Sequence, residues 1–391
     1  MLSIVLLGLV SFFTDVSSEM VYPLLPLFLT VKLGAAPALL GLIEGTAESL
    51  ASLLKVFCGY WSDRINKRRP IAVLGYGFSF LGKFLLYLSV SWGGVFCARI
   101  LDRFGKGVRT APRDALIADL AAKKDRGRCF GLHRAMDTLG AVVGIFFAYL
   151  FFAYPGAGYR RMFFWALIPA AIGIIVLFFV KEDPGRRFYS FEAGAGPEKK
   201  ERLSLKGLIA GFRSLDRRLR AFLIIAFLFS LANSSNMFLL LRAKSMGFDI
   251  KVVILLYLVY NICYALSSYP AGIISDRIGR KSLLVLGHLF YALVYLGFAL
   301  TKSFSFIWVL FGVYGVYAGL TEGVEKAFVS DLAPSQGRAT FIGLHSALVG
   351  IGLFPASLLA GVVWGLAGSA AAFILGAVFS LAAAVGLLKY V

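Results

Sequence analysis

The sequence predicts an all-α polytopic membrane protein, in which 12 transmembrane helices form two pseudo-symmetric six-helix bundles. Three observations predict this fold: an apolar composition, apolar runs of membrane-spanning length, and an internal repeat. Of the 391 residues, 59% are hydrophobic and 16% are charged, whereas about a quarter of a soluble domain is charged. A soluble protein of this length could not bury so many apolar side chains, so lipid is the expected solvent.

The apolar runs are long enough to cross a bilayer, which takes about 20 mainly apolar residues. Six runs precede a long basic stretch and six follow it. We expect the spans near 4–30, 38–60, 71–91, 94–120, 128–154, 161–180, 219–241, 250–273, 282–301, 304–332, 337–364 and 368–389. Residues 1–180 and 219–391 are therefore predicted to form the two bundles, with 181–218 as a basic cytoplasmic linker whose regulatory role stays open.

The basic residues between the apolar runs predict the orientation of the chain. Clusters of Lys and Arg at 64–69, 123–128 and 277–281 fall on the same side as the linker, and the positive-inside rule makes that side cytoplasmic. Both termini then lie inside, in what we expect to be a prokaryotic plasma membrane, while Arg160 and Arg161 oppose the bias. Because the net charge of +19 has this topological explanation, we expect no nucleic-acid partner.

An internal repeat relates the two halves at an offset of about 212 residues. Gly-Tyr-Trp-Ser-Asp-Arg-Ile at 59–65 recurs as Gly-Ile-Ile-Ser-Asp-Arg-Ile at 272–278, and Gly-Leu-His at 131–133 recurs at 343–345. Further matches relate 17–20 to 234–237 and 119–121 to 331–333. Several matches in the same order indicate duplication, and two parallel six-helix halves suggest a transporter with its binding site between them at mid-membrane.

Three motifs resemble those of the major facilitator superfamily. Segment 59–68 resembles the loop after span two of that family, G-x-x-x-D-R-x-G-R-K/R, with Asn66 in place of the second Gly. Segment 272–281 matches the same motif more closely, and 103–107 resembles the span-four motif R-x-x-Q-G with Lys106 in place of Gln. The resemblance covers the whole chain and implies a secondary transporter that moves a small solute by alternating access.

The same resemblance implies a conformational latch in the loop motif of each half. In the family, this cluster stabilises the outward-open state, because its Asp can cap a neighbouring helix and its Arg can pair with carboxylates or with the last carbonyl groups of a helix. The predicted latch residues are Gly59, Asp63, Arg64, Gly272, Asp276 and Arg277.

The fourth predicted span carries an unusual number of charges. Asp102, Lys106, Arg109 and Arg113 recur at spacings of four, three and four residues, so they share one helix face. Such a face cannot point at lipid and must face a wet cavity or acidic partners. Basic groups in such a cavity can bind a carboxylate or a phosphate. We therefore predict a substrate site, with a lean to an organic anion or zwitterion, formed by Arg103, Lys106, Arg109, Arg113, Glu322 and Glu325.

Carboxyl groups inside the predicted spans are candidate proton carriers, with H⁺ as the coupling ion. Each of the first two spans carries two of them, one helical turn apart. A carboxyl group held away from water retains its proton more readily, which suits proton carriage. The predicted coupling residues are Asp15, Glu19, Glu44, Glu48 and Asp137. The alternative, in which these groups only form buried ion pairs that hold the first bundle together, stays open.

Other functions are either rivals or disfavoured by the sequence. Proton/drug antiport of lipophilic compounds is the main rival, and a transport-inactive sensor or scaffold is a further alternative. We expect no enzyme, cofactor or metal site, because the chain has no P-loop, HExxH motif or nucleophile elbow and its four Cys residues form no ligand cluster. The expected form is a monomer embedded in lipid.

Overall fold

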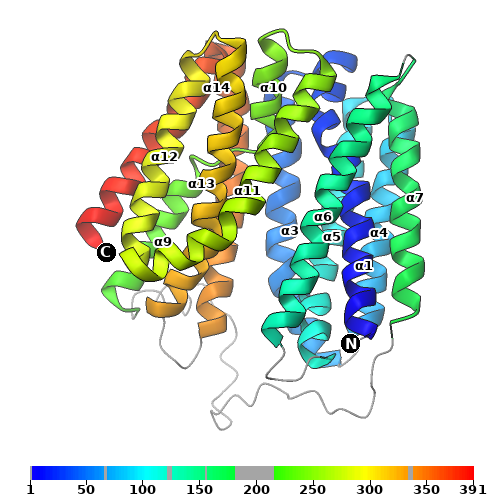
Figure 1. The fold of residues 1–391 in the computed structure, drawn as a ribbon, viewed down its shortest axis with the longest axis horizontal. Helices are drawn as coiled ribbons and strands as arrows, with labels where there is room; N and C mark the ends of the chain where they lie inside the picture. Colours follow the sequence, from blue (N-terminus) through cyan, green and yellow to red (C-terminus); the bar gives the residue numbers. More distant parts are fainter. Residues whose placement is uncertain (1, 66–67, 121–125, 155, 181–214, 333–337) are drawn as a thin grey trace.

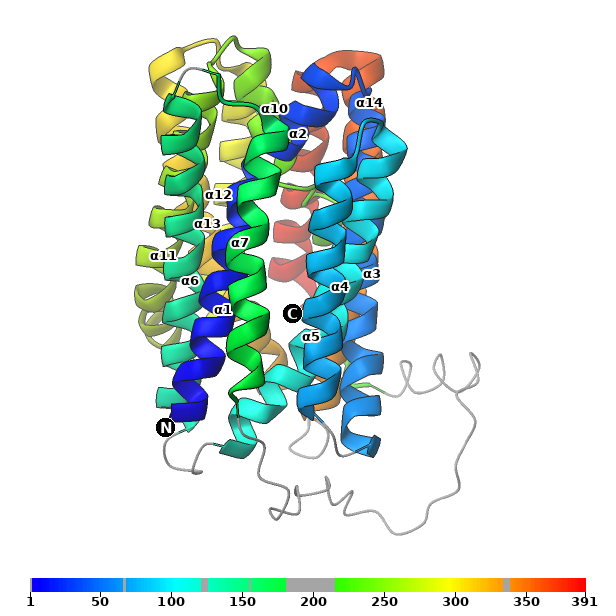
Figure 2. The same ribbon diagram turned by 90° about the vertical axis from the view of Figure 1, so that its right-hand side faces the viewer.

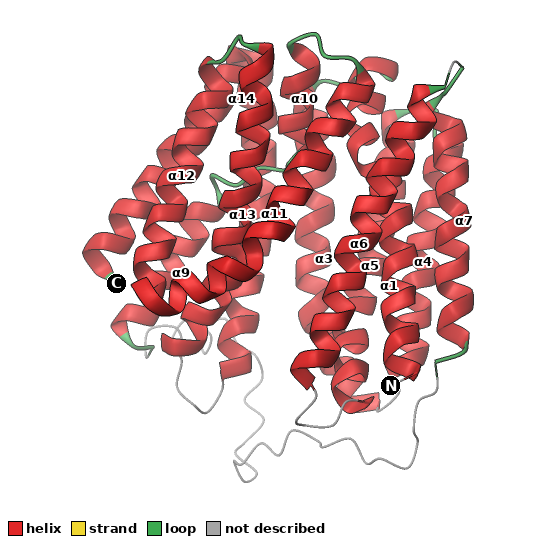
Figure 3. Ribbon diagram, in the orientation of Figure 1, coloured by secondary structure: helices red, strands yellow, loops and turns green. Residues whose placement is uncertain are grey.

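The structure is a computed structural model that describes residues 2–65, 68–120, 126–154, 156–180, 215–332 and 338–391. Throughout these residues the regular structure is helical, and the helices run roughly parallel to one another (Figures 1 and 3). The elements of the first half are α1 (Leu2–Val21), η1 (Tyr22–Leu24), α2 (Leu25–Leu27), η2 (Phe28–Lys32), α3 (Pro37–Ile65), α4 (Arg68–Leu88), α5 (Trp92–Leu120), α6 (Arg126–Ala153) and α7 (Tyr159–Phe178). Those of the second half are α9 (Arg217–Ser230), α10 (Met237–Ser245), α11 (Ile250–Ile278), α12 (Arg280–Leu300), α13 (Phe304–Leu332) and α14 (Arg338–Tyr390).

Within the described residues these elements make twelve crossings, which confirms the predicted fold class. Eight segments are long and apolar enough to qualify as membrane spans by composition alone. One of these segments, Gly343–Tyr390 within α14, holds two crossings joined at Gly368, whose φ of 84° lies in the left-handed region. The eight segments thus cover nine crossings, and three escape the criterion. These are α3 and α5, which carry several charged residues, and the broken crossing that α9 and α10 share.

The first and seventh crossings are both irregular, although at different heights of the repeat. In the first, Pro23 and Pro26 remove backbone donors, and the chain passes through a 3-10 turn and a π-helical turn. In the seventh, residues 231–236 leave the helix, whereas the sequence predicted one continuous span over 219–241. The Asn and Ser side chains there compete with the helical hydrogen bonds: Asn236 Nδ2, for example, donates to the Tyr260 hydroxyl at 3.2 Å.

Two equivalent ion pairs confirm that the halves share one local design. Arg68 on α4 lies 2.9 Å from Asp119 on α5. At an offset of 212 residues, Arg280 on α12 lies 2.6 Å from Asp331 on α13. Both pairs occupy the end of the molecule where the N-terminus lies, which we call the lower end from its place in Figure 1. The opposite end, where α4 turns into α5, is the upper end.

The predicted latch residues lie close to these pairs in the chain. The side chains of Gly59, Asp63, Arg64, Gly272 and Asp276 lie outside the described residues. Arg277 is exposed near the end of α11. The latch therefore stays a prediction, as does the linker, most of which also lies outside the described residues.

The two halves contact each other closely along α3 and α14. A Cβ atom added at Gly41 would overlap the carbonyl oxygen of Ser357, and one at Gly361 would overlap that of Pro37. Ser49 Oγ donates to the carbonyl oxygen of Gly350 at 2.6 Å. These contacts use the upper part of α3, and Figures 1 and 2 show the ribbons of the two halves meeting at the upper end. Small residues thus let the two backbones approach directly, as is common between helices in membranes.

Candidate functional site

A polar cavity of about 210 Å³ lies at mid-height, mainly within the first half. Its walls come from α1, α3, α4 and α5, and Tyr257 of α11 contributes from the second half. The charged lining residues are Asp15, Glu19, Glu48, Lys83, Arg99, Asp102, Arg103, Lys106 and Arg109. The prediction that the charged face of the fourth span points into a cavity rather than into lipid agrees with this placement.

Glycines let α4 and α5 approach so closely that their side chains share one polar layer. A Cβ atom added at Gly82 would lie 2.6 Å from the backbone nitrogen of Asp102. This packing brings Lys83 of α4 into the cavity that α5 lines. Lys83 was not among the residues that we predicted, although a lone Lys in the apolar run 71–91 was a signal that could have identified it.

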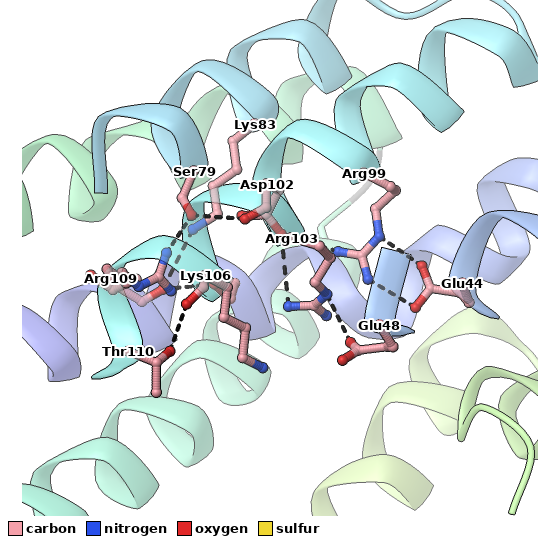
Figure 4. Close-up of polar contacts among 12 residues, drawn as sticks. Glu44, Glu48, Ser79, Lys83, Arg99, Asp102, Arg103, Lys106, Arg109 and Thr110 are labelled. Carbon is pink, nitrogen blue, oxygen red and sulfur yellow. Dashed lines mark hydrogen bonds and ion pairs between the residues drawn. The ribbon is translucent and has the colours of Figure 1, made fainter. Parts of the chain in front are cut away.

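Buried ion pairs join α5 to α3, as Figure 4 shows. Arg99 makes a bidentate contact with Glu44, with Nε to Oε1 at 2.7 Å and Nη2 to Oε2 at 2.8 Å. One turn along, Arg103 Nε lies 2.8 Å from Glu48 Oε1. Asp102 lies between the two guanidinium groups, at 3.3 Å from Arg99 and 3.8 Å from Arg103. Arg99 and Arg103 are therefore held by carboxylates of the protein itself.

The remaining bases of the cavity have different surroundings. Arg109 lies over the ring of Tyr76 at 4.6 Å and donates to the hydroxyl of Ser79. The Lys83 ammonium reaches the carbonyl oxygen of Thr14 at 3.5 Å. Lys106 lines the cavity, and no carboxylate of the described residues lies within 4 Å of its ammonium group. Figure 4 draws no dashed line from this group to a carboxylate.

A second group of carboxyls lies where α1 packs against α6. The carboxyl groups of Asp15 and Asp137 are close neighbours. Ser11 Oγ donates to Asp137 Oδ1 at 2.5 Å, and Arg113 Nη1 donates to the same hydroxyl at 3.2 Å. Glu19, one turn further along α1, has a buried Oε2 atom without a hydrogen-bond partner.

Two of the predicted site residues are used elsewhere. Arg113 pairs with its neighbour Asp114 at 2.8 Å and is absent from the cavity lining. Glu44 is fully buried, at 0% exposure, behind Arg99. The structure therefore separates the predicted residues into a cavity group and a group of neighbouring ion pairs.

A polar contact connects the two halves below the cavity. Arg134 of α6 donates from Nη2 to the Tyr264 hydroxyl of α11 at 2.9 Å, and that hydroxyl donates to the Glu322 carboxylate of α13. Arg134 also reaches Asp137 at 3.4 Å, which links this contact to Asp15. The Arg134 side chain is 60% exposed and Glu322 is also exposed, so this contact is accessible to water.

The second half faces the centre with tyrosines and few charges. A cavity of about 260 Å³ in this half is lined by Tyr260, Tyr314 and Tyr317, together with Glu322 and Glu325. The rings form a stacked series along α11 that starts at Tyr22 of the first half, with centroid distances of 5.4, 5.7 and 6.3 Å for successive pairs. The series consists of Tyr22, Tyr257, Tyr260 and Tyr264. We did not predict it, because aromatic residues at helical spacing are also typical of an apolar core.

This arrangement defines a class of protein: a helical membrane transporter whose two six-helix halves enclose a polar centre. A family model described as Major Facilitator Superfamily matches residues 7–256 and, in a second match, residues 222–391. The chain therefore belongs to the Major Facilitator Superfamily, a family of secondary transporters, and the resemblance drawn from the motifs is confirmed.

Relatives and solved structures agree with this membership. The chain is similar to an uncharacterized MFS-type transporter, MJ1317, of Methanocaldococcus jannaschii, with 40% identity over 93% of this chain and 88% of the relative. It is 25% identical to the fosmidomycin resistance protein of Escherichia coli over 73% of each chain. Among solved structures, the D-xylose–proton symporter matches with a TM-score of 0.75 at 20% identity, over 100% of this chain and 97% of that chain, which supports the fold.

Proposed function

We propose that this protein is a proton-coupled transporter that moves a small organic anion or zwitterion through the cavity between its halves. The single observation that carries the proposal is the position of Lys106. No carboxylate of the described residues lies within 4 Å of its ammonium group, which lines the cavity, while Arg99 and Arg103 are already paired. A half-buried cation inside the membrane is stabilised when an anion joins it. A solute carboxylate or phosphate supplies that anion.

The pair Asp15 and Asp137 supports proton coupling. Because the two carboxyl groups face each other, the site holds one proton in its relaxed form and releases it when the carboxyls separate. Glu19 lies between this pair and Lys106, and its free oxygen can accept a second proton or the ammonium group of a zwitterion. Proton loss from this region adds a negative charge near Lys106, and this charge weakens anion binding. Proton binding and anion binding thus favour each other.

Alternating access requires that different contacts between the halves break at the two ends. In the proposed cycle the upper end opens when the α3–α14 contact at Gly41 and Ser49 breaks. The contact from Arg134 through Tyr264 to Glu322 rearranges as the lower end closes. We propose that the lower end is cytoplasmic, because the basic segments 64–69 and 277–281 lie there. The motif residues Asp63 and Asp276 are proposed to stabilise the closed lower end.

The direct experiment is flux into proteoliposomes under an imposed proton gradient, with a panel of labelled organic anions and matched neutral analogues. Lys106→Ala is expected to reduce transport of the anion about 10- to 100-fold, the size of a lost charge-assisted hydrogen bond. Lys389→Ala, an exposed Lys near the C-terminus, serves as the control. An anion flux that is insensitive to Lys106→Ala contradicts the assigned substrate site.

A second variant tests coupling separately from binding. Asp15→Asn is expected to abolish accumulation driven by the proton gradient while exchange of labelled for unlabelled solute continues. If Asp15→Asn retains full gradient-driven accumulation, Asp15 is not the proton carrier. Absence of any flux in correctly folded wild-type protein supports the alternative of a transport-inactive sensor.

Export of toxic compounds is a second candidate, favoured by similarity to proteins named for resistance. Besides the fosmidomycin resistance protein, the chain is 31% identical to the multidrug resistance protein MdtH of Photorhabdus laumondii over 32% of this chain. The tyrosine-lined second half suits compounds with aromatic rings. Everted membrane vesicles energised with a proton gradient distinguish the two candidates, since an exporter accumulates its compound inside them.

A further inference from the structure

A cluster of cations without acidic neighbours occupies the upper end of the first half. Lys32 is the last residue of the π-helical turn, and Arg160 and Arg161 lie in the first turn of α7; all three side chains are exposed. Three segments form this end, and none of them contains Asp or Glu: 22–43, 87–94 and 152–165. At the same end of the second half, by contrast, Asp249 accompanies Lys302. The cation cluster also opposes the charge bias that orients the rest of the chain.

Contacts within the protein leave most of the hydrogen-bonding capacity of the two arginines unused. Arg160 Nε donates to the carbonyl oxygen of Tyr87 at 3.4 Å, and Arg161 Nη1 donates to that of Gly156 at 3.3 Å. Each guanidinium group has five N–H donors. No carboxylate of the described residues lies within 4 Å of either group. Both arginines lie in the first turn of α7, where the helix dipole disfavours cations, so a bound anion would relieve an unfavourable arrangement.

Two cavities meet at Arg160 and Arg161, and apart from these cations both linings are mainly apolar. One, of about 610 Å³, lies on the upper end and includes Lys32 and Tyr159. The other, of about 370 Å³, lies on the flank between α4 and α7. Its other lining residues are Tyr87, Phe164 and Trp165. The last two are 49% and 51% exposed on the apolar outer surface of the bundle. Two largely apolar recesses therefore share one pair of cations.

We propose that this surface binds the phosphate-bearing headgroup of an anionic phospholipid from the leaflet at the upper end. The phosphate lies between Arg160 and Arg161, the rest of the headgroup extends toward Lys32, and an acyl chain covers Phe164 and Trp165. Aromatic and basic side chains of this kind are typical of the membrane interface. A free phosphate ion would use the cations but would leave the flank cavity without an occupant, so the flank favours a lipid.

The test is lipid binding to the purified full-length protein in mild detergent, followed by native mass spectrometry. The delipidated protein is titrated with phosphatidylglycerol and, for comparison, with zwitterionic phosphatidylcholine. We expect the wild type to bind one phosphatidylglycerol with a clear preference, and R160Q/R161Q to lose about tenfold or more of that preference. R160K/R161K keeps the charges and is expected to retain part of it.

The control is K302Q, which removes an exposed cation at the same end of the second half and should leave the preference unchanged. If R160Q/R161Q does not fold, R161Q is tested alone, because it leaves the Arg160 contact with α4 intact. This variant should lose a smaller part of the preference for phosphatidylglycerol. Equal binding of the two lipids by the wild type overturns the proposal, as does full retention of the preference in the arginine variants. Displacement of phosphatidylglycerol by inorganic phosphate alone assigns the surface to a free anion and likewise overturns it.

Discussion

The two halves place different chemistry at the same positions of the repeat. At the offset of 212 residues, Lys83 on α4 corresponds to Tyr295 on α12, and Asp102 on α5 corresponds to Tyr314 on α13. All four side chains are buried near the centre of their half. In the first half they belong to a network of charges, whereas in the second half the rings pack against each other, with centroids of Tyr295 and Tyr314 at 6.1 Å.

This difference separates what the shared scaffold provides from what each half does with it. Both halves keep a basic–acidic ion pair at the lower end. Both also have a glycine where two consecutive helices pack together: Gly75 of α4 lies against α5, and Gly287 of α12 lies against α13. In the proposed function, the charged centre of the first half exchanges protons and holds an anion, because its groups ionise. The tyrosine centre of the second half offers hydrogen bonds and ring surfaces whose charge stays constant near neutral pH. We infer that the first half supplies the driving force and the second half the shape of the solute site.

The largest expected effect comes from breaking the charged centre at one partner. Glu44→Gln leaves the buried Arg99 guanidinium without its bidentate partner, and we expect the free energy of unfolding to fall by about 3–5 kcal/mol. The neutral centre should tolerate a comparable change better: Tyr291→Phe removes one hydrogen bond to the Ala232 carbonyl oxygen at 2.6 Å, which costs about 1 kcal/mol. Unfolding in mild detergent, followed by circular dichroism, measures both.

The double variant Glu44→Leu/Arg99→Met sharpens the same comparison. It removes both charges and fills the space with apolar side chains, a replacement that is often close to neutral for a buried ion pair. We expect the double variant to be more stable than Glu44→Gln alone. A double variant that is less stable than the single one indicates that Asp102, which Arg99 also contacts at 3.3 Å, depends on the same guanidinium group.

An intermediate effect is expected where the shared glycine meets different neighbours. A Cβ atom at Gly75 would lie 2.8 Å from the backbone nitrogen of Arg109 and 2.8 Å from the carbonyl oxygen of Gly105. At Gly287 the nearest atom is instead the side-chain methyl group of Thr321, which can rotate. Gly75→Ala should therefore lower the free energy of unfolding by about 1–3 kcal/mol. Gly287→Ala should lower it clearly less. Equal losses of melting temperature in the two variants contradict this reading.

The sequence predicts the scaffold better than the chemistry of the site, for physical reasons. Hydropathy and the repeat locate the crossings, because the membrane constrains length and polarity along the chain. Helical spacing likewise predicts the charged face of α5. Which charges pair depends on contacts between helices, so Glu44 could not be distinguished from Asp15 before the structure placed Arg99 against it. The break at 231–236 depends on Asn236 meeting Tyr260 and Tyr314, which lie far away in the sequence.

The smallest expected effect concerns the contact that joins the two chemistries. Tyr264→Phe removes the hydroxyl that links Arg134 of the charged half to Glu322 of the tyrosine half. Because this contact is accessible to water, its loss should change the free energy of the observed arrangement by under about 1 kcal/mol. That change alters the balance between the two access states by roughly a few-fold, without a measurable change of unfolding temperature.

Electron paramagnetic resonance distances between spin labels at Val90 and Lys302 report this balance, since both residues are exposed at the upper end of opposite halves. We expect Tyr264→Phe to increase the population with the longer distance, because a weaker lower contact changes the relative stability of the two states while α3 and α14 stay unaltered. Tyr154→Phe, at an exposed loop residue, is the matched control. An unchanged distance distribution in Tyr264→Phe means that Arg134 and Glu322 are solvated surface groups, and that this contact does not couple the two halves.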